Sequence, residues 1–70
     1  MRTCKRLSDG VLETVEFNEL VKGDLFMLID DINGEKYIVG TYEAKTDPYI
    51  NRDGIWQIDI KGDEEVEGEE

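Results

Sequence analysis

The chain has one cysteine, Cys4, and no histidine among its 70 residues. An internal disulfide and the common tetrahedral zinc sites are therefore excluded as supports for its fold. A domain of this length buries only about 60% of the surface that its unfolded chain exposes, so its margin of stability is small. The fold must then depend on a compact apolar core, on association with other chains, or on both.

A hairpin in the middle of the chain is the clearest structural signal. Asp24–Asp30 contains five consecutive apolar residues, which indicates a strand covered on both faces and therefore central in its sheet. Asn33-Gly34 follows, and both residues tolerate the left-handed backbone that a type I′ turn needs. Lys36–Ala44 is rich in Tyr, Ile, Val and Thr and predicts the return strand.

Two further strands and a helical turn are predicted on either side of this hairpin. Val11–Phe17 alternates apolar and polar residues apart from Leu12, which indicates a half-buried strand. Residues 18–21 predict a short helical turn with Asn18 as its cap. A strand over Ile55–Ile60 would direct alternate side chains toward the core, namely Trp56, Ile58 and Ile60.

These elements predict an all-β fold, a small and partly closed antiparallel barrel of SH3-like size with one short helical turn. Closure is favoured because it removes exposed strand edges. An open antiparallel sheet that dimerises through an edge is the alternative. We expect residues 11–61 to form the β domain, residues 1–10 to form a basic flexible lead, and residues 62–70 to form a disordered acidic tail.

Charge is the most extreme feature of the composition. Eighteen acidic and eight basic residues give a net charge of −10. This sign disfavours direct binding to nucleic acid and to anionic membranes, which both attract clustered Lys and Arg. No apolar run is long enough to cross a bilayer, the first residues lack the apolar stretch of a signal peptide, and a lone thiol suits a reducing compartment. We therefore expect a soluble, cytoplasmic protein.

Catalytic and metal-binding groups are not identifiable in the sequence. Cys4 has cationic neighbours that could lower its pKa, but a nucleophilic thiol also needs a base, and the chain has no histidine. Asp30–Glu35 and Asn51–Gly54 resemble calcium loops. An EF-hand alignment puts Ile29 or Tyr49 at the first ligand position, so both segments are predicted to be turns. We expect no enzymatic activity, no metal and no cofactor.

The segment Lys45–Gly54 is the candidate binding site. It is long for a connection in so small a domain, and long loops are disproportionately functional. Tyr and Arg are enriched at interface hot spots. The candidate binding residues are Tyr49, Asn51, Arg52 and Asp53. In the alternative interpretation, Tyr49 folds down to cap the core and Pro48 stiffens the turn.

Two sequence patterns resemble those of small uncharacterised proteins from phages and prophages of Gram-positive bacteria. The first is Phe17-x-x-Leu20-x-x-Gly23-Asp24-x-Phe26, and the second is Asp47-Pro48-Tyr49-x-Asn51-x-Asp53-Gly54-x-Trp56-x-Ile58. The similarity spans roughly residues 11–60, although the short turn at Asp31–Gly34 replaces a longer hairpin. The resemblance implies a phage or mobile-element context in a bacterial host cell, but no activity and no residue role.

The hypothesis that follows is a non-enzymatic accessory factor that binds a protein partner, through the 45–54 loop or an exposed strand edge. A second hypothesis is an acidic mimic of nucleic acid that inhibits a host nucleic-acid-binding protein such as a defence nuclease or a polymerase. In that case the acidic residues 62–70 would do more than keep the chain soluble. A small-ligand-binding or structural phage protein that acts as a homo-oligomer is the third.

Overall fold

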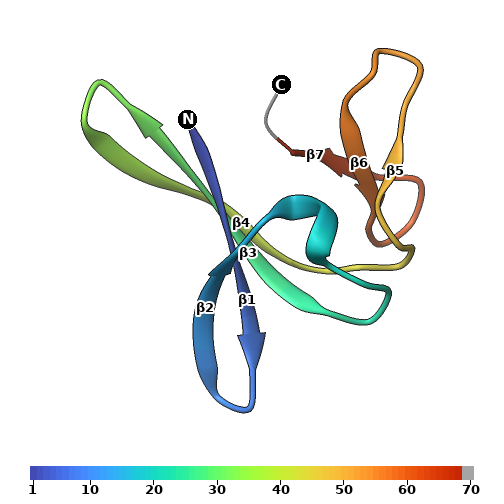
Figure 1. Cartoon of the computed structure of the whole chain (residues 1–70), viewed down its shortest axis with the longest axis horizontal. Coiled ribbons are helices and arrows are strands. Elements are labelled where there is room, and N and C mark those ends of the chain that lie inside the picture. The colour runs from blue at the N-terminus through green and yellow to red at the C-terminus, as the bar shows by residue number, and fades with distance from the viewer. Residues whose placement is uncertain (69–70) are drawn as a thin grey trace.

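The structure is a computed structural model that describes residues 1–68. Within this range the chain forms two antiparallel sheets and a single turn of 3-10 helix (Figure 1). One sheet has four strands and the other has three. In chain order the elements are β1 (Arg2–Ser8), β2 (Val11–Val15), η1 (Phe17–Glu19), β3 (Leu25–Ile32), β4 (Glu35–Glu43), β5 (Tyr49–Ile50), β6 (Trp56–Asp59) and β7 (Glu65–Glu67). The prediction of an all-β fold with one short helical turn is confirmed.

The four-stranded sheet, in the order β2-β1-β3-β4, is built from two hairpins with similar turns. Asn33 and Gly34 have φ values of 54° and 82°, as the predicted type I′ turn between β3 and β4 requires. Asp9 and Gly10, with φ values of 51° and 79°, form the equivalent turn between β1 and β2. Strand β3 is central, as predicted.

The expectation of a flexible lead over residues 1–10 is wrong. Strand β1 lies between β2 and β3 and pairs with both along most of its length. Its inward positions alternate charged and apolar side chains, because Arg2 and Arg6 lie on the same face as Cys4. Arg2 is paired with Asp30 and Arg6 with Glu13. These ion pairs hide the hydrophobic alternation by which a strand is recognised in a sequence.

The predicted disordered tail is also wrong for residues 62–68. Glu65–Glu67 forms β7, which pairs with β6 and sets Val66 opposite Ile58. The backbone N–H of Gly68 then donates to the carbonyl oxygen of Trp56 over 2.8 Å. One apolar side chain and a free edge on β6 are enough to order this acidic segment. The last two predicted tail residues, 69 and 70, lie outside the described part of the chain.

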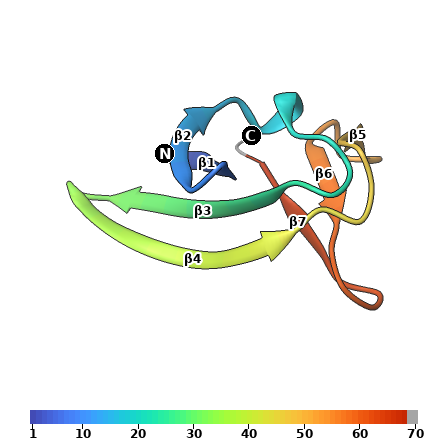
Figure 2. The same ribbon diagram turned by 90° about the horizontal axis from the view of Figure 1, so that it is seen from below.

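The two sheets do not close into a barrel, which corrects the predicted architecture. In the described residues the first sheet ends at β2 and β4, and the second ends at β5 and β7. Strands β5 and β7 have only two and three residues, too few to continue a ladder around a barrel. The second sheet instead lies beside one end of the first, while both hairpins of the first extend away from it (Figures 1 and 2).

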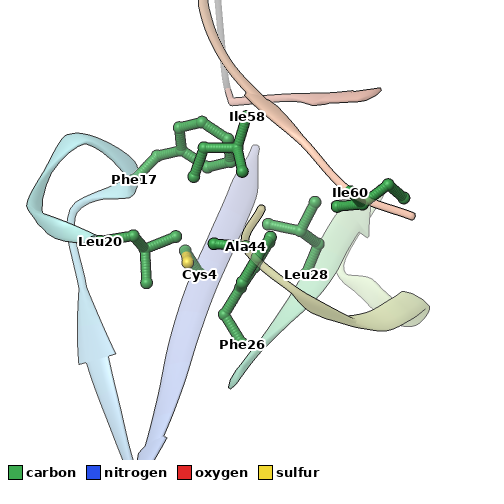
Figure 3. Packing of buried hydrophobic residues seen from close by; sticks show 8 residues of the cluster. All are labelled: Cys4, Phe17, Leu20, Phe26, Leu28, Ala44, Ile58 and Ile60. Atoms are coloured by element: carbon green, nitrogen blue, oxygen red, sulfur yellow. The ribbon is translucent and has the colours of Figure 1, made fainter. Parts of the chain in front are cut away.

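The core fills the junction between the sheets (Figure 3). Phe26 and Leu28 of β3 meet Ile58 of β6, and Phe17 packs edge-on against Phe26 with ring centroids 6.2 Å apart. The eight buried residues are Cys4, Phe17, Leu20, Phe26, Leu28, Ala44, Ile58 and Ile60. The inward prediction is confirmed for Ile58 and Ile60. It is wrong for Trp56, which lies on the same face of β6 but beyond the core and is 37% exposed.

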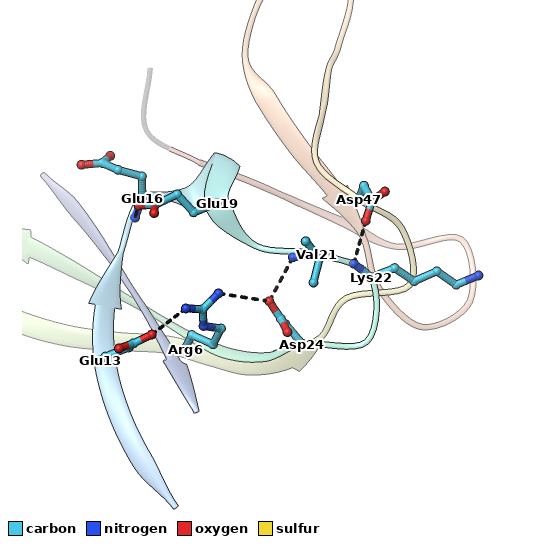
Figure 4. Close-up of polar contacts among 8 residues, drawn as sticks. All are labelled: Arg6, Glu13, Glu16, Glu19, Val21, Lys22, Asp24 and Asp47. Atoms are coloured by element: carbon cyan, nitrogen blue, oxygen red, sulfur yellow. Dashed lines mark hydrogen bonds and ion pairs between the residues drawn. The ribbon is translucent and has the colours of Figure 1, made fainter. Parts of the chain in front are cut away.

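Polar contacts fix the segment between β2 and β3 that carries Phe17 and Leu20 into this core (Figure 4). Glu16, rather than the predicted Asn18, caps η1, and its backbone N–H donates to the Glu19 carboxylate over 2.9 Å. Asp24 accepts from the backbone N–H of Val21, also over 2.9 Å. The first bond satisfies an N–H group that the start of a helical turn leaves free, and the second fixes the chain after η1.

We predict that Gly68→Ala destabilises the protein by about 1–3 kcal/mol, as overpacking of a filled site does. A Cβ at this position would lie 2.9 Å from Cγ of Phe17. Urea unfolding followed by tryptophan fluorescence measures the effect. Glu64→Ala, in the same acidic segment, is the control and should change the free energy of unfolding by less than about 0.5 kcal/mol. Equal stability of the two variants would contradict the ordered end of β7.

Candidate functional site

The predicted binding loop, Lys45–Gly54, contains β5 and the turn that joins β5 to β6. Tyr49 lies in β5 and pairs with Gln57 of β6. Its hydroxyl donates to Asp59 Oδ1 over 2.5 Å and accepts from Gln57 Nε2 over 2.7 Å. The bond to Asp59 raises the pKa of Tyr49 above its usual value, because it stabilises the neutral phenol. Tyr49 therefore stabilises the β5–β6 hairpin through side-chain bonds between its two strands.

Asn51 is the structural centre of the turn. Its Oδ1 accepts from the backbone N–H groups of Asp53 and Ile55, over 2.9 and 3.1 Å. Its Nδ2 donates to Gln57 Oε1 over 2.8 Å. The side chain thus replaces backbone partners inside the turn, as Asn commonly does. A partner could reach it only by breaking these bonds.

Arg52 and Asp53 are exposed, as is the ring of Tyr49, whereas Asn51 is half-buried. Arg52 forms no ion pair with any residue in the range 1–68. The structure therefore brings Tyr49 and Asn51 together as bonded parts of the β5–β6 hairpin. Arg52 and Asp53 lie in the turn of that hairpin. A binding role for the four residues remains a prediction.

Cys4 lies in the core and not in a basic, mobile lead. It is 5% exposed, and burial raises the pKa of its thiol to about 11. The nearby Arg6 guanidinium opposes this shift but does not reverse it. The thiol is therefore protonated at neutral pH, and its environment is that of a small apolar side chain.

The two segments that resemble calcium loops form turns. Asp31 Oδ1 accepts from the backbone N–H of Gly34 over 3.2 Å, and the other segment is the turn around Asn51. Across residues 1–68, no group of three or more acidic, Cys or His side chains is arranged to hold a metal ion. The side-chain oxygens of Asp31 and Asn51 instead accept hydrogen bonds from nearby backbone N–H groups.

A hollow of about 440 Å³ lies between η1, β1 and the end of β7, with Phe17 and Trp56 in its wall. Arg2 is the cation that borders it. The Arg2 side chain is already bonded to Asp30 Oδ1 over 2.7 Å and to the carbonyl oxygen of Glu67 over 2.8 Å. The hydrogen bond from Arg2 lowers the pKa of the Asp30 carboxyl group. Thr3, Thr14 and Asn18 also line the hollow, so its wall is partly apolar and partly polar.

Exposed apolar side chains also lie on the β3–β4 hairpin, whose turn extends away from the second sheet (Figure 2). Four side chains between 42% and 67% exposed gather there. We call them the hairpin tip: Ile32, Tyr37, Ile38 and Val39. Three of them lie on β4, which has no neighbour on its other side within the described chain. A bulge at Val39 interrupts the ladder to β3 there.

Sequence reasoning missed the hairpin tip because it interpreted Lys36–Ala44 as an ordinary return strand. Three consecutive apolar residues, Tyr37-Ile38-Val39, break the alternation of a half-buried strand, and this was the available signal. The interpretation of Asp24–Asp30 as covered on both faces hid it further. Only the face of β3 that carries Phe26 and Leu28 is buried; Leu25 on the other face is exposed.

The residues that resemble the phage-protein patterns have structural roles. Phe17, Leu20 and Phe26 are core residues. Gly23 has a φ of 95°, and its N–H donates to the Ala44 carbonyl over 2.8 Å. Asp47 accepts from the backbone N–H of Lys22 over 2.8 Å, which ties the second pattern to the first (Figure 4). These members of the two patterns therefore contribute to packing and to the connection between the two sheets.

Comparisons with protein-family models, with curated proteins and with solved structures found no match for this chain. The described residues include no helix with the length and apolar character that a membrane crossing requires.

Asn51→Ala should destabilise the protein by about 1–3 kcal/mol, because it leaves turn N–H groups without their acceptor. Arg52→Ala should change stability by less than about 0.5 kcal/mol, since the residue is exposed at the tip of the same turn. Thermal unfolding of the two variants in parallel measures the difference. Similar losses in both would contradict the division of the predicted site into structural and exposed residues.

Proposed function

We propose that this chain is a non-enzymatic, protein-binding accessory factor and that it binds its partner through the hairpin tip. The observation that supports the proposal is the position of the exposed apolar side chains. They gather at the end of the β3–β4 hairpin, away from the junction where the core forms (Figure 1). Surface apolar residues that are scattered singly are ordinary, whereas Ile32 and Tyr37 share one face of a projecting hairpin, and such a pair is typical of an interaction site.

The chemistry of the hairpin tip suits a protein partner. Tyr37 offers a large ring with few rotatable bonds, which is the kind of anchor that dominates protein interfaces. Its hydroxyl donates to Glu35, and this bond raises the pKa of Tyr37 by stabilising the neutral phenol. Strand β4 also presents a free edge, onto which an extended segment of a partner could add as a further strand.

The resemblance to phage and prophage proteins supports the cytoplasm of a bacterial host as the setting. Arg52 and Asp53, on the β5–β6 hairpin, are the alternative contact residues. They offer charge and hydrogen-bonding groups but little apolar surface, so we expect them to contribute less than the hairpin tip.

Affinity capture from a lysate of a Gram-positive host tests the proposal. The intact chain should retain a specific protein, and the double variant Ile32→Ala with Tyr37→Ala should retain at least about tenfold less, as loss of a hot spot implies. Both positions are half-exposed and outside the core, so the variant should unfold at nearly the same temperature as the parent chain.

The matched control is Val21→Ala with Ile50→Ala, which removes side chains of similar exposure from other elements. It should retain the partner fully. Loss of the partner on Arg52→Ala, with the hairpin-tip variant unaffected, would move the site to the β5–β6 hairpin. Failure of the intact chain to retain any specific protein would reject the proposed function.

A nucleic-acid mimic is the second candidate, and the ordered strand β7 favours it. Register sets Glu65 opposite Asp59, and Glu67 opposite Gln57, on the polar face of the second sheet. Successive carboxylates on one face of a strand are about 6.8 Å apart. A row fixed in this way can bind a basic groove with less loss of entropy than a disordered tail would.

If the captured protein binds nucleic acid, double-stranded DNA should compete with the chain for it. Glu65→Gln with Glu67→Gln should weaken capture, and added salt should weaken it further because charge dominates such contacts. The paired change Asp9→Asn with Glu43→Gln removes equal charge from exposed positions on the first sheet and is the control. Capture that resists both DNA and salt would exclude mimicry.

A further inference from the structure

The four-stranded sheet has a second apolar face, opposite the core. Strand register places Leu12, Leu7 and Leu25 side by side in one row across β2, β1 and β3. Met27 and Ile29 continue along β3 on the same face, because alternate residues of a strand point the same way. Ile38 of the hairpin tip pairs with Ile29 and lies at the end of this face. We call the first five residues the outer face: Leu7, Leu12, Leu25, Met27 and Ile29.

The described chain leaves the outer face uncovered. Its three leucines are between 42% and 47% exposed, and Met27 and Ile29 are only half-buried. The second sheet and η1 contribute their buried side chains to the core on the opposite side of β3, where Phe26 and Leu28 lie. A sheet with two apolar faces and a cover on one of them is typical of one half of a β-sandwich.

Charge distinguishes the outer face from the rest of the surface. The rows that cross this side of the sheet also carry Lys5, Lys36, Asp31 and Glu43, so the two positive and two negative charges cancel. The whole chain carries −10. A basic partner would be attracted to the acidic surfaces elsewhere, whereas another molecule with the same large negative charge meets least repulsion here.

We propose that a second copy of this chain packs on the outer face, so that two four-stranded sheets form a symmetric sandwich. A two-fold axis would set the leucine row of one copy against that of the other, which makes the apolar surface self-complementary. Stacked sheets of this kind pack about 10 Å apart with interdigitated side chains.

The available area fits a weak dimer. Four strands are about 19 Å wide, and the seven residues of β1 span about 24 Å, which gives roughly 450 Å² of projected sheet in each copy. The two copies together approach the lower limit of about 1,000–1,200 Å² for specific interfaces. We therefore expect a dissociation constant in the micromolar range rather than an obligate dimer. This inference does not depend on the protein partner proposed above.

Sedimentation equilibrium on the full chain, from about 1 µM to about 1 mM, tests the proposal. The chain should pass from monomer to dimer in this range. Raising the salt concentration from about 0.05 M to about 0.5 M should strengthen the dimer, because salt screens the repulsion between two strongly acidic molecules. An interface held by ion pairs would respond in the opposite direction.

Leu7→Glu should raise the dissociation constant at least about 30-fold, since it buries an unpaired carboxylate from each copy. The control Val11→Glu adds the same charge to the same hairpin, but on the opposite face of the sheet, and should stay close to the parent chain. Leu25→Lys adds charge of the other sign and should also prevent dimerisation. Circular dichroism and thermal unfolding confirm that each variant is folded.

A chain that stays monomeric at every concentration and salt would overturn the proposal. So would equal dissociation constants for Leu7→Glu and Val11→Glu. The hairpin-tip variant, Ile32→Ala with Tyr37→Ala, should dimerise normally, so failure of the dimer and failure of the partner-binding proposal give different results. If monomeric chains lose the captured protein on Leu7→Glu, the outer face belongs to that partner and not to a second copy.

Discussion

The contact between β3 and β6 is the interaction on which the rest of the structure depends. Phe26 and Leu28 from the first sheet and Ile58 from the second have almost no accessible surface. No strand ladder joins the sheets within the described chain, so this apolar contact is the main link between them. Two hydrogen bonds add to it, from Arg2 to the carbonyl oxygen of Glu67 and from the backbone N–H of Lys45 to the carbonyl oxygen of Asp59. Phe17 and Leu20 complete the apolar contact because Glu16 and Glu19 fix the single helical turn that carries them. With only eight buried side chains, the loss of one large residue would remove a considerable share of the stability.

The small core explains why some surface residues are needed for folding and others are not. Polar residues of the β5–β6 hairpin, such as Asn51 and Tyr49, have their polar groups occupied by neighbours in the same hairpin. Apolar residues far from the junction contribute little to folding. The hairpin tip and the outer face both consist of such residues, and both lie on the first sheet. The hairpin tip is at its far end and the outer face is on its uncovered side. A dimer through the outer face would present two hairpin tips at once, which would increase the apparent affinity for a partner with two sites.

Local signals in the sequence were reliable where backbone geometry decides the conformation. Asn33-Gly34 identified its hairpin because few residues tolerate positive φ, and Ile58 and Ile60 were recognised by alternation. The failures come from non-local compensation. Strand β1 was missed because Arg2 and Arg6 occupy inward positions and are neutralised by residues of the neighbouring strands, Asp30 and Glu13. Trp56 keeps the correct alternation, but β6 extends beyond the core there. The candidate site had the same difficulty: whether Tyr49, Asn51 or Tyr37 is available to a partner depends on which neighbours the fold gives it.

The bond from Arg2 to the carbonyl of Glu67 joins the first strand to the last. The two ends of the described chain are consequently close together (Figure 1). A pulling force applied at both ends would load this contact and the short strand β7 before it reached either hairpin of the larger sheet. Strand β7 pairs through three residues only, so it would peel away one hydrogen-bonded pair at a time, and mechanical resistance would be low even though the core is tightly packed.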